Sequence, residues 1–211
     1  MIDQDLLTAL QYDLLELPNG GASWPSGLWT RDEVLASLSE RQARLLKDAL
    51  VHVKVSSPIA VAATTRRVAL PSDWVRTLSV VWTTTATGAV RELLRSDSFE
   101  ADHGLKDYLL TDNTPFVYFE YDAGQLEMEL APAPIANGTL TLLYVPAGTA
   151  LNGNGVALTI PDILAHGQKY GTLADLLAKD GRGRDASRAA YSEQRFQLAI
   201  DAARILLKGW A

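Results

Sequence analysis

The sequence predicts an α+β protein: an antiparallel helical bundle formed from both ends of the chain, with a small antiparallel β-sandwich or barrel inserted between them. Apolar residues recur at helical spacing at both ends, and short runs rich in β-branched and aromatic residues, separated by turn signals, fill the middle. The chain has 211 residues, of which 47% are hydrophobic, enough for a buried core without disulfides or metals. We therefore expect a helical domain of residues 1–52 and 160–211 and an inserted β domain of residues 53–159.

The first helix is expected over residues 2–17, where an apolar stripe at helical spacing runs up to Pro18. A loop over residues 18–28 follows, rich in Gly, Pro and Ser. Trp24 and Trp29 are expected to anchor this region on a core, because indole rings seldom stay exposed.

A second helix is expected from Thr30 to about residue 52. Thr30 and Glu33 have the spacing of a capping box, in which the hydroxyl accepts from the amide three residues on and the carboxylate reaches back. Apolar residues then follow the helical period, and Gln42 interrupts their stripe.

Strands are expected in the middle of the chain, where Val, Ile, Thr and aromatic residues concentrate. The clearest one ends at the turn Asp122-Ala123-Gly124, and the run after that turn alternates apolar with charged residues, as in a hairpin. A short helix is expected at residues 97–104. The expected strands cover residues 67–70, 74–85, 116–121, 126–130 and 139–145.

The helical period returns at Ile160, and Pro161 suits a first helical turn because its missing N–H costs nothing there. Gly167 and Gly171 are one turn apart, which would let another element approach closely. The Gly-rich residues 180–183 break this helix, and a last long helix is expected over residues 185–209.

The last helix carries two apolar stripes with seven-residue spacing. The first consists of Ala189, Phe196, Ala203 and Trp210. The second consists of Tyr191, Leu198 and Ile205, with Leu206 and Leu207 beside it. One stripe suffices to bury a helix on a single core. Two stripes indicate either a helix covered by its own bundle and by a neighbouring molecule, or a central helix within one large core.

Charge is distributed unevenly along the chain, whose formal net charge is −6. Residues 179–211 carry seven basic and four acidic side chains, so the remainder is strongly acidic. Tight nucleic-acid binding is not expected, because it needs Lys and Arg to displace counterions. The basic end could dock on an acidic partner by complementarity, or its cations could simply be favourable late in a helix.

No catalytic residue, cofactor site or metal site is expected, and we predict that the protein is not an enzyme. The chain has no cysteine, and its three histidines, His52, His103 and His166, lie on three different elements. Residues 181–184 lack the Lys-Ser/Thr ending of a phosphate loop. An acidic patch lacks the pattern of a calcium loop and is interpreted as a solvated face. It comprises Asp97, Glu100, Asp102, His103 and Asp107.

No apolar run of about 18 residues is present, so no membrane-spanning helix is expected. The acidic first residues lack the pattern of a secretory signal, and we expect the protein to be made in the cytoplasm.

Several segments, in their order and spacing, resemble the head-to-tail adaptor (connector or neck) proteins of tailed bacteriophages and related gene transfer particles. The resemblance covers most of residues 30–205. It includes a strand ending in Leu70-Pro71-Ser72-Asp73, a later strand that runs into a Pro-rich corner at residues 131–134, and a closing helix over residues 185–196 with the pattern D-x-x-R-A-x-x-Y-x-x-x-F. The segments that carry it are residues 68–74, 126–134, 140–146, 158–161 and 185–196.

The resemblance implies a structural virion protein at the head–tail interface. Such adaptors form a ring, usually of twelve copies, below the portal, where they extend the DNA channel and meet a downstream neck or tail protein. DNA would pass through without specific binding, consistent with an acidic body. It also implies synthesis in the bacterial host cytoplasm, no membrane and no cofactor.

The resemblance further implies that the C-terminal helix and tail dock onto the portal. The residues expected to do so are Arg195, Arg204, Leu206, Leu207, Lys208 and Trp210. Trp210 is the preferred anchor, because interface hot spots favour Trp, although it could instead pack on its own bundle. Deleting residues 204–211 is expected to leave a folded protein that no longer joins portal rings. The second stripe, Tyr191, Leu198 and Ile205, is expected to pack between subunits.

Two other functions fit parts of the sequence. The aromatic run Phe116 to Tyr121 could offer stacking rings in a non-catalytic carbohydrate- or surface-binding β module. Against this, its rings cannot all share one face of a strand, so part of the run belongs to the core. A hydrolase with a carboxylate pair is the other alternative.

Overall fold

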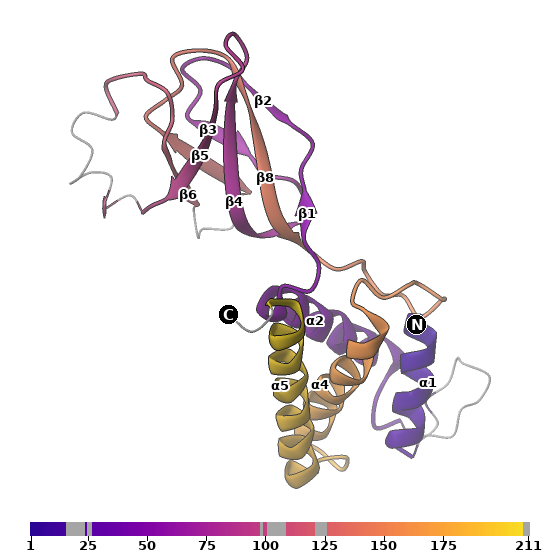
Figure 1. The fold of residues 1–211 in the computed structure, drawn as a ribbon. Coiled ribbons are helices and arrows are strands. Elements are labelled where there is room, and N and C mark those ends of the chain that lie inside the picture. The colour runs from indigo at the N-terminus through magenta and orange to yellow at the C-terminus, as the bar shows by residue number, and fades with distance from the viewer. Residues whose placement is uncertain (16–23, 25–26, 98, 101–108, 121–125, 209–211) are drawn as a thin grey trace. The chain divides into compact units, whose positions relative to one another are not determined.

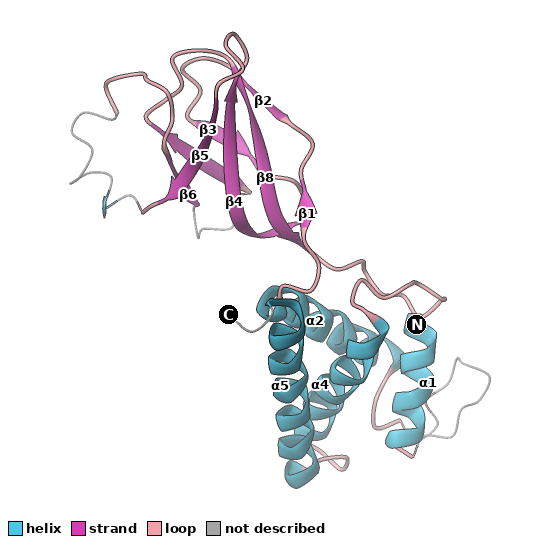
Figure 2. Ribbon diagram, in the orientation of Figure 1, coloured by secondary structure: helices cyan, strands magenta, loops and turns pink. Residues whose placement is uncertain are grey.

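The computed structural model describes residues 1–15, 24, 27–97, 99–100, 109–120 and 126–208, and shows a mixed α+β protein (Figure 2). The predicted class is therefore confirmed. The chain divides into two compact units, which we call the helical unit, Met1–His52 with Ala147–Ala211, and the sheet unit, Val53–Pro146. Residues 147–159, which we had assigned to the β domain, lie in the helical unit.

The helical unit takes its helices from both ends of the chain (Figure 1). In order they are α1 (Asp3–Asp13), α2 (Arg31–Ala49), a single 3-10 turn (Asp162–Leu164), α4 (Ala165–Ala178) and α5 (Ala186–Lys208). Helix α4 contacts α1, α2 and α5, and α2 also contacts α5. Leucines of α1, α2 and α4 share one apolar core, to which Trp29 belongs, and Trp24 packs against it. Both tryptophans are therefore anchors, as predicted.

The N-terminal helices end earlier than predicted. Helix α1 stops at Asp13 because Leu15 adopts a left-handed φ of 60°. Helix α2 begins as expected, with the Thr30 hydroxyl accepting from the Glu33 amide at 3.2 Å. It ends at Ala49 with Leu50 at φ 54°. A left-handed residue commonly ends a helix, but glycine usually fills the position, so leucine gave no signal there.

The sheet unit contains one eight-stranded sheet that curls into a half-barrel (Figures 1 and 2). Its path is β1-β8-β4-β5-β6-β7-β3, and β2 also pairs with β8. The strands are β1 (Lys54–Val55), β2 (Ile59–Val61), β3 (Arg67–Ala69), β4 (Trp74–Thr84), β5 (Val90–Arg95), β6 (Val117–Glu120), β7 (Glu127–Ala131) and β8 (Gly138–Pro146).

This sheet corrects the prediction in two respects. It is not wholly antiparallel, because β5 and β6 pair in parallel, with Leu94 opposite Val117. Strands β1, β2 and β5 were not predicted: β1 and β2 are very short, and β5 lacks an alternating pattern, since of its six residues only Leu93 is buried. The short helix expected at residues 97–104 falls mostly outside the described residues.

The concave face of the sheet carries its own core. Trp82 and Tyr144 are almost fully buried there. Gly138 makes room for Trp82, since a Cβ on this glycine would lie 2.2 Å from the indole Cζ2. Among the described residues, this core consists of side chains of the sheet unit alone.

The loop over residues 152–156 is fastened to the first turn of α1 by one buried carboxylate. Asp3 accepts hydrogen bonds from the amides of Asn152, Gly153, Gly155 and Val156 at 2.6–3.0 Å. The left-handed φ of Gly153 (74°) and Gly155 (89°), a conformation that glycine adopts without steric cost, lets the loop wrap around this carboxylate. Burial opposes ionisation, but the four amide bonds outweigh it and lower the pKa of Asp3.

Candidate interaction surface on the last helix

The first apolar stripe of α5 faces the interior of the helical unit. Ala189, Phe196 and Ala203 are buried, and Ile200 joins them. Trp210, the fourth member predicted for this stripe, lies outside the described residues. Helix α5 therefore packs on its own unit through this side, and the question is what its other side does.

Helices α4 and α5 approach closely through the two glycines singled out in the sequence. A Cβ on Gly167 would lie 2.5 Å from the Cβ of Ala199, well inside contact distance. A Cβ on Gly171 would lie 2.9 Å from Phe196 Cδ2. The expectation that another element approaches these glycines is confirmed, and that element is α5.

A charged network fixes the rotation of α5 about its axis. Arg41 of α2 forms a forked pair with Asp175 of α4, in which its Nε donates to Oδ2 at 2.8 Å. Its Nη1 donates to Glu193 of α5 at 2.6 Å. The guanidinium also lies over the Phe196 ring, 4.9 Å from the centroid. The hydrogen bond with Asp175 raises the pKa of Arg41, although burial acts against it.

One arginine thereby ties three helices together at the level of the buried stripe. Glu193 and Phe196 lie three residues apart, so they are neighbours on the surface of α5. Because both contact Arg41, this side of α5 must face α2 and α4. The opposite side of α5 must then point away from the unit.

The second apolar stripe of α5 is exposed. Tyr191 is 49% exposed, Leu198 53%, Ile205 57% and Leu206 67%. Of the two interpretations of the stripes, a central helix covered on all sides within one core is therefore wrong for the isolated chain. A single helix face with several large, exposed apolar side chains is typical of a surface that another protein covers.

Tyr191 has a defined place at the start of this face. Its ring meets Tyr170 of α4 edge-on, with centroids 6.4 Å apart. Arg195 donates from Nε to the Tyr191 hydroxyl at 2.8 Å and lies over its ring. The contacts fix Tyr191 at one edge and leave nearly half of its side chain open.

The residues expected to dock onto the portal are not all alike. Arg195 and Leu206 are exposed on α5. Arg204 donates from Nε to the carbonyl of Asp48 at 2.9 Å, so it caps the end of α2 within its own unit. Leu207 and Lys208 belong to α5, but their side chains, like all of Trp210, lie outside the described residues.

The residues that orient this face were not predicted from the sequence; they are Arg41, Asp175 and Glu193. The one available signal was the polar pair Arg41-Gln42 inside an otherwise apolar stripe of α2. Gln42 also has a structural role: its side-chain amide donates to Thr149 O at 3.1 Å and accepts from Thr159 N at 3.2 Å.

Other kinds of site find little support in the described part of the chain. No three acidic or histidine side chains among the described residues gather in an arrangement that could hold a metal ion. His52 and His166 are exposed on separate elements, and His103 lies outside the described residues. Asp97 accepts from the amide of Glu100 at 2.7 Å, a turn contact, and Asp102 and Asp107 are not among the described residues.

The described part of the aromatic run, residues 116–120, does not form a stacking platform, and Tyr121 lies outside the described residues. Tyr118 and Phe119 are both buried, one in the concave core and the other on the opposite side of the strand. A carbohydrate- or surface-binding module that uses these rings is therefore not supported. None of the described helices combines the length and hydropathy that crossing a membrane requires.

A comparison with known protein families gives a match over nearly the whole chain. The sequence model of a family described as SU10 adaptor protein matches residues 4–208, nearly the whole chain. No curated protein matches the chain. The matched region includes the whole sheet unit, most of the helical unit and all of α5.

Proposed function

The chain belongs to the SU10 adaptor protein family, and from this membership we propose that it forms a ring below the portal that connects the capsid to the tail and extends the DNA channel. The membership confirms the expected identity as a bacteriophage adaptor, a structural component of the virion. The ring, its number of twelve copies, the portal and tail contacts and the absence of enzymatic activity are parts of the proposal.

The observation that supports the ring best is the division of α5 into a buried and an exposed apolar stripe. The buried stripe holds the helix on its own unit, so the exposed Tyr191, Leu198 and Ile205 are available to a neighbouring copy. In a ring, each subunit would make this contact with the next subunit. A head-to-tail interface of this kind closes into a ring when the rotations between neighbouring copies add up to one full turn.

Portal docking is assigned to the end of the same helix. Arg195 and Leu206 are exposed, and the basic excess of residues 179–211 would complement an acidic partner surface. The rest of the chain carries a net negative charge, which would repel the DNA phosphates and let DNA move through the channel without specific binding.

The ring contact is tested by placing charges on the exposed stripe. Leu198→Glu with Ile205→Glu is expected to leave the protein folded and to abolish ring formation on portal, measured by electron microscopy and co-sedimentation. The matched control is Ala36→Glu with Ala43→Glu, which adds the same charge to exposed positions of α2. Equal loss of assembly in both double variants would attribute the effect to charge in general and contradict the assignment of the stripe.

The portal contact is tested by deleting residues 204–211, a change that also removes Ile205 of the second stripe. The truncated protein is expected to fold, since the buried stripe up to Ala203 remains, and to fail to co-sediment with portal rings. Binding at full occupancy would contradict portal docking by this end of α5, and would also show that assembly does not need Ile205.

A further inference from the structure

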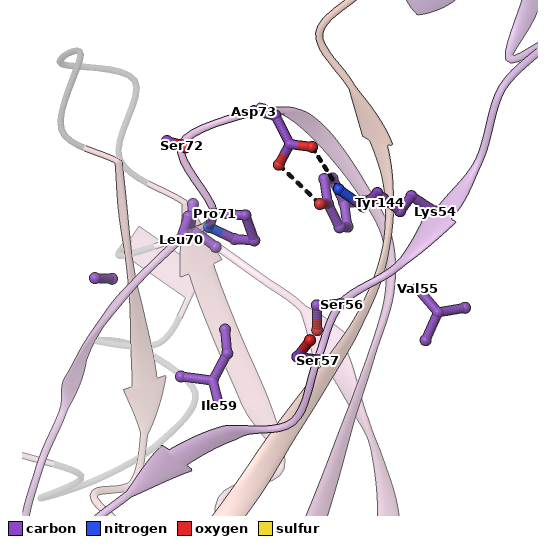
Figure 3. Close-up of a pocket in the computed structure, with 11 residues that line it drawn as sticks. Lys54, Val55, Ser56, Ser57, Ile59, Leu70, Pro71, Ser72, Asp73 and Tyr144 are labelled. Atoms are coloured by element: carbon purple, nitrogen blue, oxygen red, sulfur yellow. Dashed lines mark hydrogen bonds and ion pairs between the residues drawn. The ribbon is translucent and has the colours of Figure 1, made fainter.

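The two ends of the curled sheet border one hollow. The order of strands in the sheet begins with β1 and ends with β3, which pairs with β7. Strands β1 and β2 both pair with β8. A hollow of about 410 Å³ is lined on one side by Lys54 to Ser57 and Ile59, and on the other by residues 69–73. Figure 3 shows these two segments facing each other across the opening. Within the described residues no ladder joins β1 or β2 to β3.

The backbone of β3 turns hydrogen-bonding groups toward this hollow. Leu70 donates its N–H to the carbonyl of Leu126 at 2.8 Å, and the carbonyl of Arg66 accepts from Leu130 N at 2.8 Å. Residues of an antiparallel strand alternate in the side to which both backbone groups point. The N–H and C=O of Ala69 therefore point away from β7, on the side of the hollow that this residue lines.

The same alternation applies to the other end of the sheet. Ser56 donates its N–H to the carbonyl of Leu142 at 2.8 Å, which turns its backbone toward β8. The backbone groups of the preceding residue, Val55, point away from β8. Val55 also lines the hollow, so each border contributes a strand edge.

Side chains close the gap at one mouth of the hollow. Lys54 of β1 donates to Asp73, in the turn after β3, at 2.8 Å, and the Tyr144 hydroxyl donates to the other oxygen of the same carboxylate at 2.8 Å (Figure 3). The hydrogen bond from Lys54 lowers the pKa of Asp73, so the Lys54–Asp73 pair is charged at neutral pH. Because the ion pair is solvent-exposed, it contributes little stability and can open easily.

We propose that this hollow binds an extended peptide segment of a partner protein, which adds as a strand along the Ala69 edge and beside Val55. Strand addition uses the backbone groups of an exposed sheet edge for affinity and alternate side-chain pockets for specificity. The partner is a chain other than this protein, and the inference holds whether or not α5 forms the ring contact.

The walls of the hollow indicate which side chains the segment would carry. Leu70 is buried in the concave core, and Ile59 packs against that core from the other border. A residue of the segment that points inward would meet these two and should be apolar. Its neighbours would meet the hydroxyls of Ser57 and Ser72 and should be small or polar. An alternation of apolar and hydroxyl side chains fits both walls.

The test uses a peptide that alternates valine and threonine between terminal lysines, titrated into the full-length protein. We expect the amide signals of Val55 and Ala69 to shift and their hydrogen exchange to slow about tenfold at saturation, measured by NMR. The matched control peptide carries N-methyl groups on its valines, which keeps the side chains and removes the N–H donors of the valines. It is expected to bind at least about tenfold more weakly.

The protein variant for this test is Ala69→Pro, which removes the donor on the outer side of β3, where proline is tolerated because no ladder bond is lost. It is expected to weaken binding of the unmodified peptide about tenfold. If the variant does not fold, the proposal is still tested by comparing how tightly the natural protein binds the unmodified and the N-methylated peptide. Unchanged exchange at Val55 and Ala69, or equal binding of both peptides, would overturn the proposal. Self-association that Ala69→Pro abolishes would overturn the assignment to a partner, because a second copy would then be the occupant.

Discussion

Arg41 determines which side of α5 is exposed. Its side chain is largely buried and contacts Asp175, Glu193 and the Phe196 ring, so one residue of α2 orients α4 and α5 together. A buried charge without its partners is costly, whereas a complete network is tolerated. The direction of the exposed stripe therefore depends on a residue that is not part of that stripe.

Replacing Arg41 is expected to be strongly destabilising. Arg41→Ala should lower the free energy of unfolding by about 2–4 kcal/mol, because two partly buried carboxylates lose their shared cation. Urea unfolding monitored by circular dichroism measures the change. Arg44→Ala is the control: Arg44 is 45% exposed with contacts of 3.5–3.6 Å, and its loss should cost less than about 1 kcal/mol. Similar losses in the two variants would contradict the role given to Arg41.

Asp3 makes stability depend on pH. Folding lowers its pKa, so the charged carboxylate stabilises the native state above the unfolded value of about 3.9. This contribution is lost as the pH falls through the lower, folded value. Asp3→Asn is expected to cost about 1–3 kcal/mol at neutral pH and clearly less at about pH 2, in urea unfolding at both pH values. Asp5→Asn, on the same helix but exposed, is the control. If Asp3→Asn lowered the free energy of unfolding equally at both pH values, the shape of the Asp3 side chain, and not its charge, would hold the loop.

At the scale of elements, the closeness of α4 and α5 rests on small residues at the crossing. Gly167 faces Ala199 without space for a further methyl group. Close approach of two helices allows long rows of van der Waals contacts, and a larger side chain would force the axes apart.

A double-mutant cycle tests this packing. Gly167→Ala is expected to destabilise by about 1–3 kcal/mol in spite of the better helix propensity of alanine, because its Cβ would overlap that of Ala199. Combining it with Ala199→Gly removes the overlapping methyl group and should restore most of the stability, as measured by thermal unfolding. Additive losses in the double variant would mean that the two residues do not meet.

The elements that could be predicted are those whose pattern is local. The stripes of α2 and α5, the cap at Thr30 and the strands at β4, β6, β7 and β8 all follow from residues that lie close together in the sequence. What could not be predicted depends on distant partners. Strand β5 has no apolar alternation and is defined by β4 and β6 on either side, and the bonds of Arg41 join residues more than a hundred positions apart.

The candidate surface shows the same division. The periodicity identified Tyr191, Leu198 and Ile205 as a second stripe, but it could not decide whether that stripe was covered. Only the positions of Arg41, Gly167 and Gly171 on other helices determine which side of α5 is buried.

At the scale of the whole molecule, the chain consists of two units with separate cores. As far as the structure describes the chain, the apolar cluster of the helical unit contains no residue of the strands, and the concave core of the sheet contains no residue of the helices. Each unit therefore has what a domain needs to fold alone.

The sheet unit is expected to fold when expressed by itself as residues 53–146. Its proton NMR spectrum should be dispersed, and its thermal unfolding should be cooperative, because Trp82 and Tyr144 remain buried among its own strands. Removing part of that core by Trp82→Ala should abolish the transition, since loss of a buried Trp costs about 3–5 kcal/mol. A spectrum without dispersion for the unchanged segment would show that its core needs the helices.

The pairing of Lys54 with Tyr144 places the first and last strands of the sheet unit side by side, so the chain enters and leaves it at neighbouring points. Segments whose ends meet in this way are the ones most easily exchanged between proteins, because the host chain has only a short gap to bridge. The sheet unit can consequently diverge, or be replaced by another fold with adjacent ends, while the helices keep their register. An adaptor that evolves to fit a different tail protein could in this way change its sheet unit and retain its helical unit.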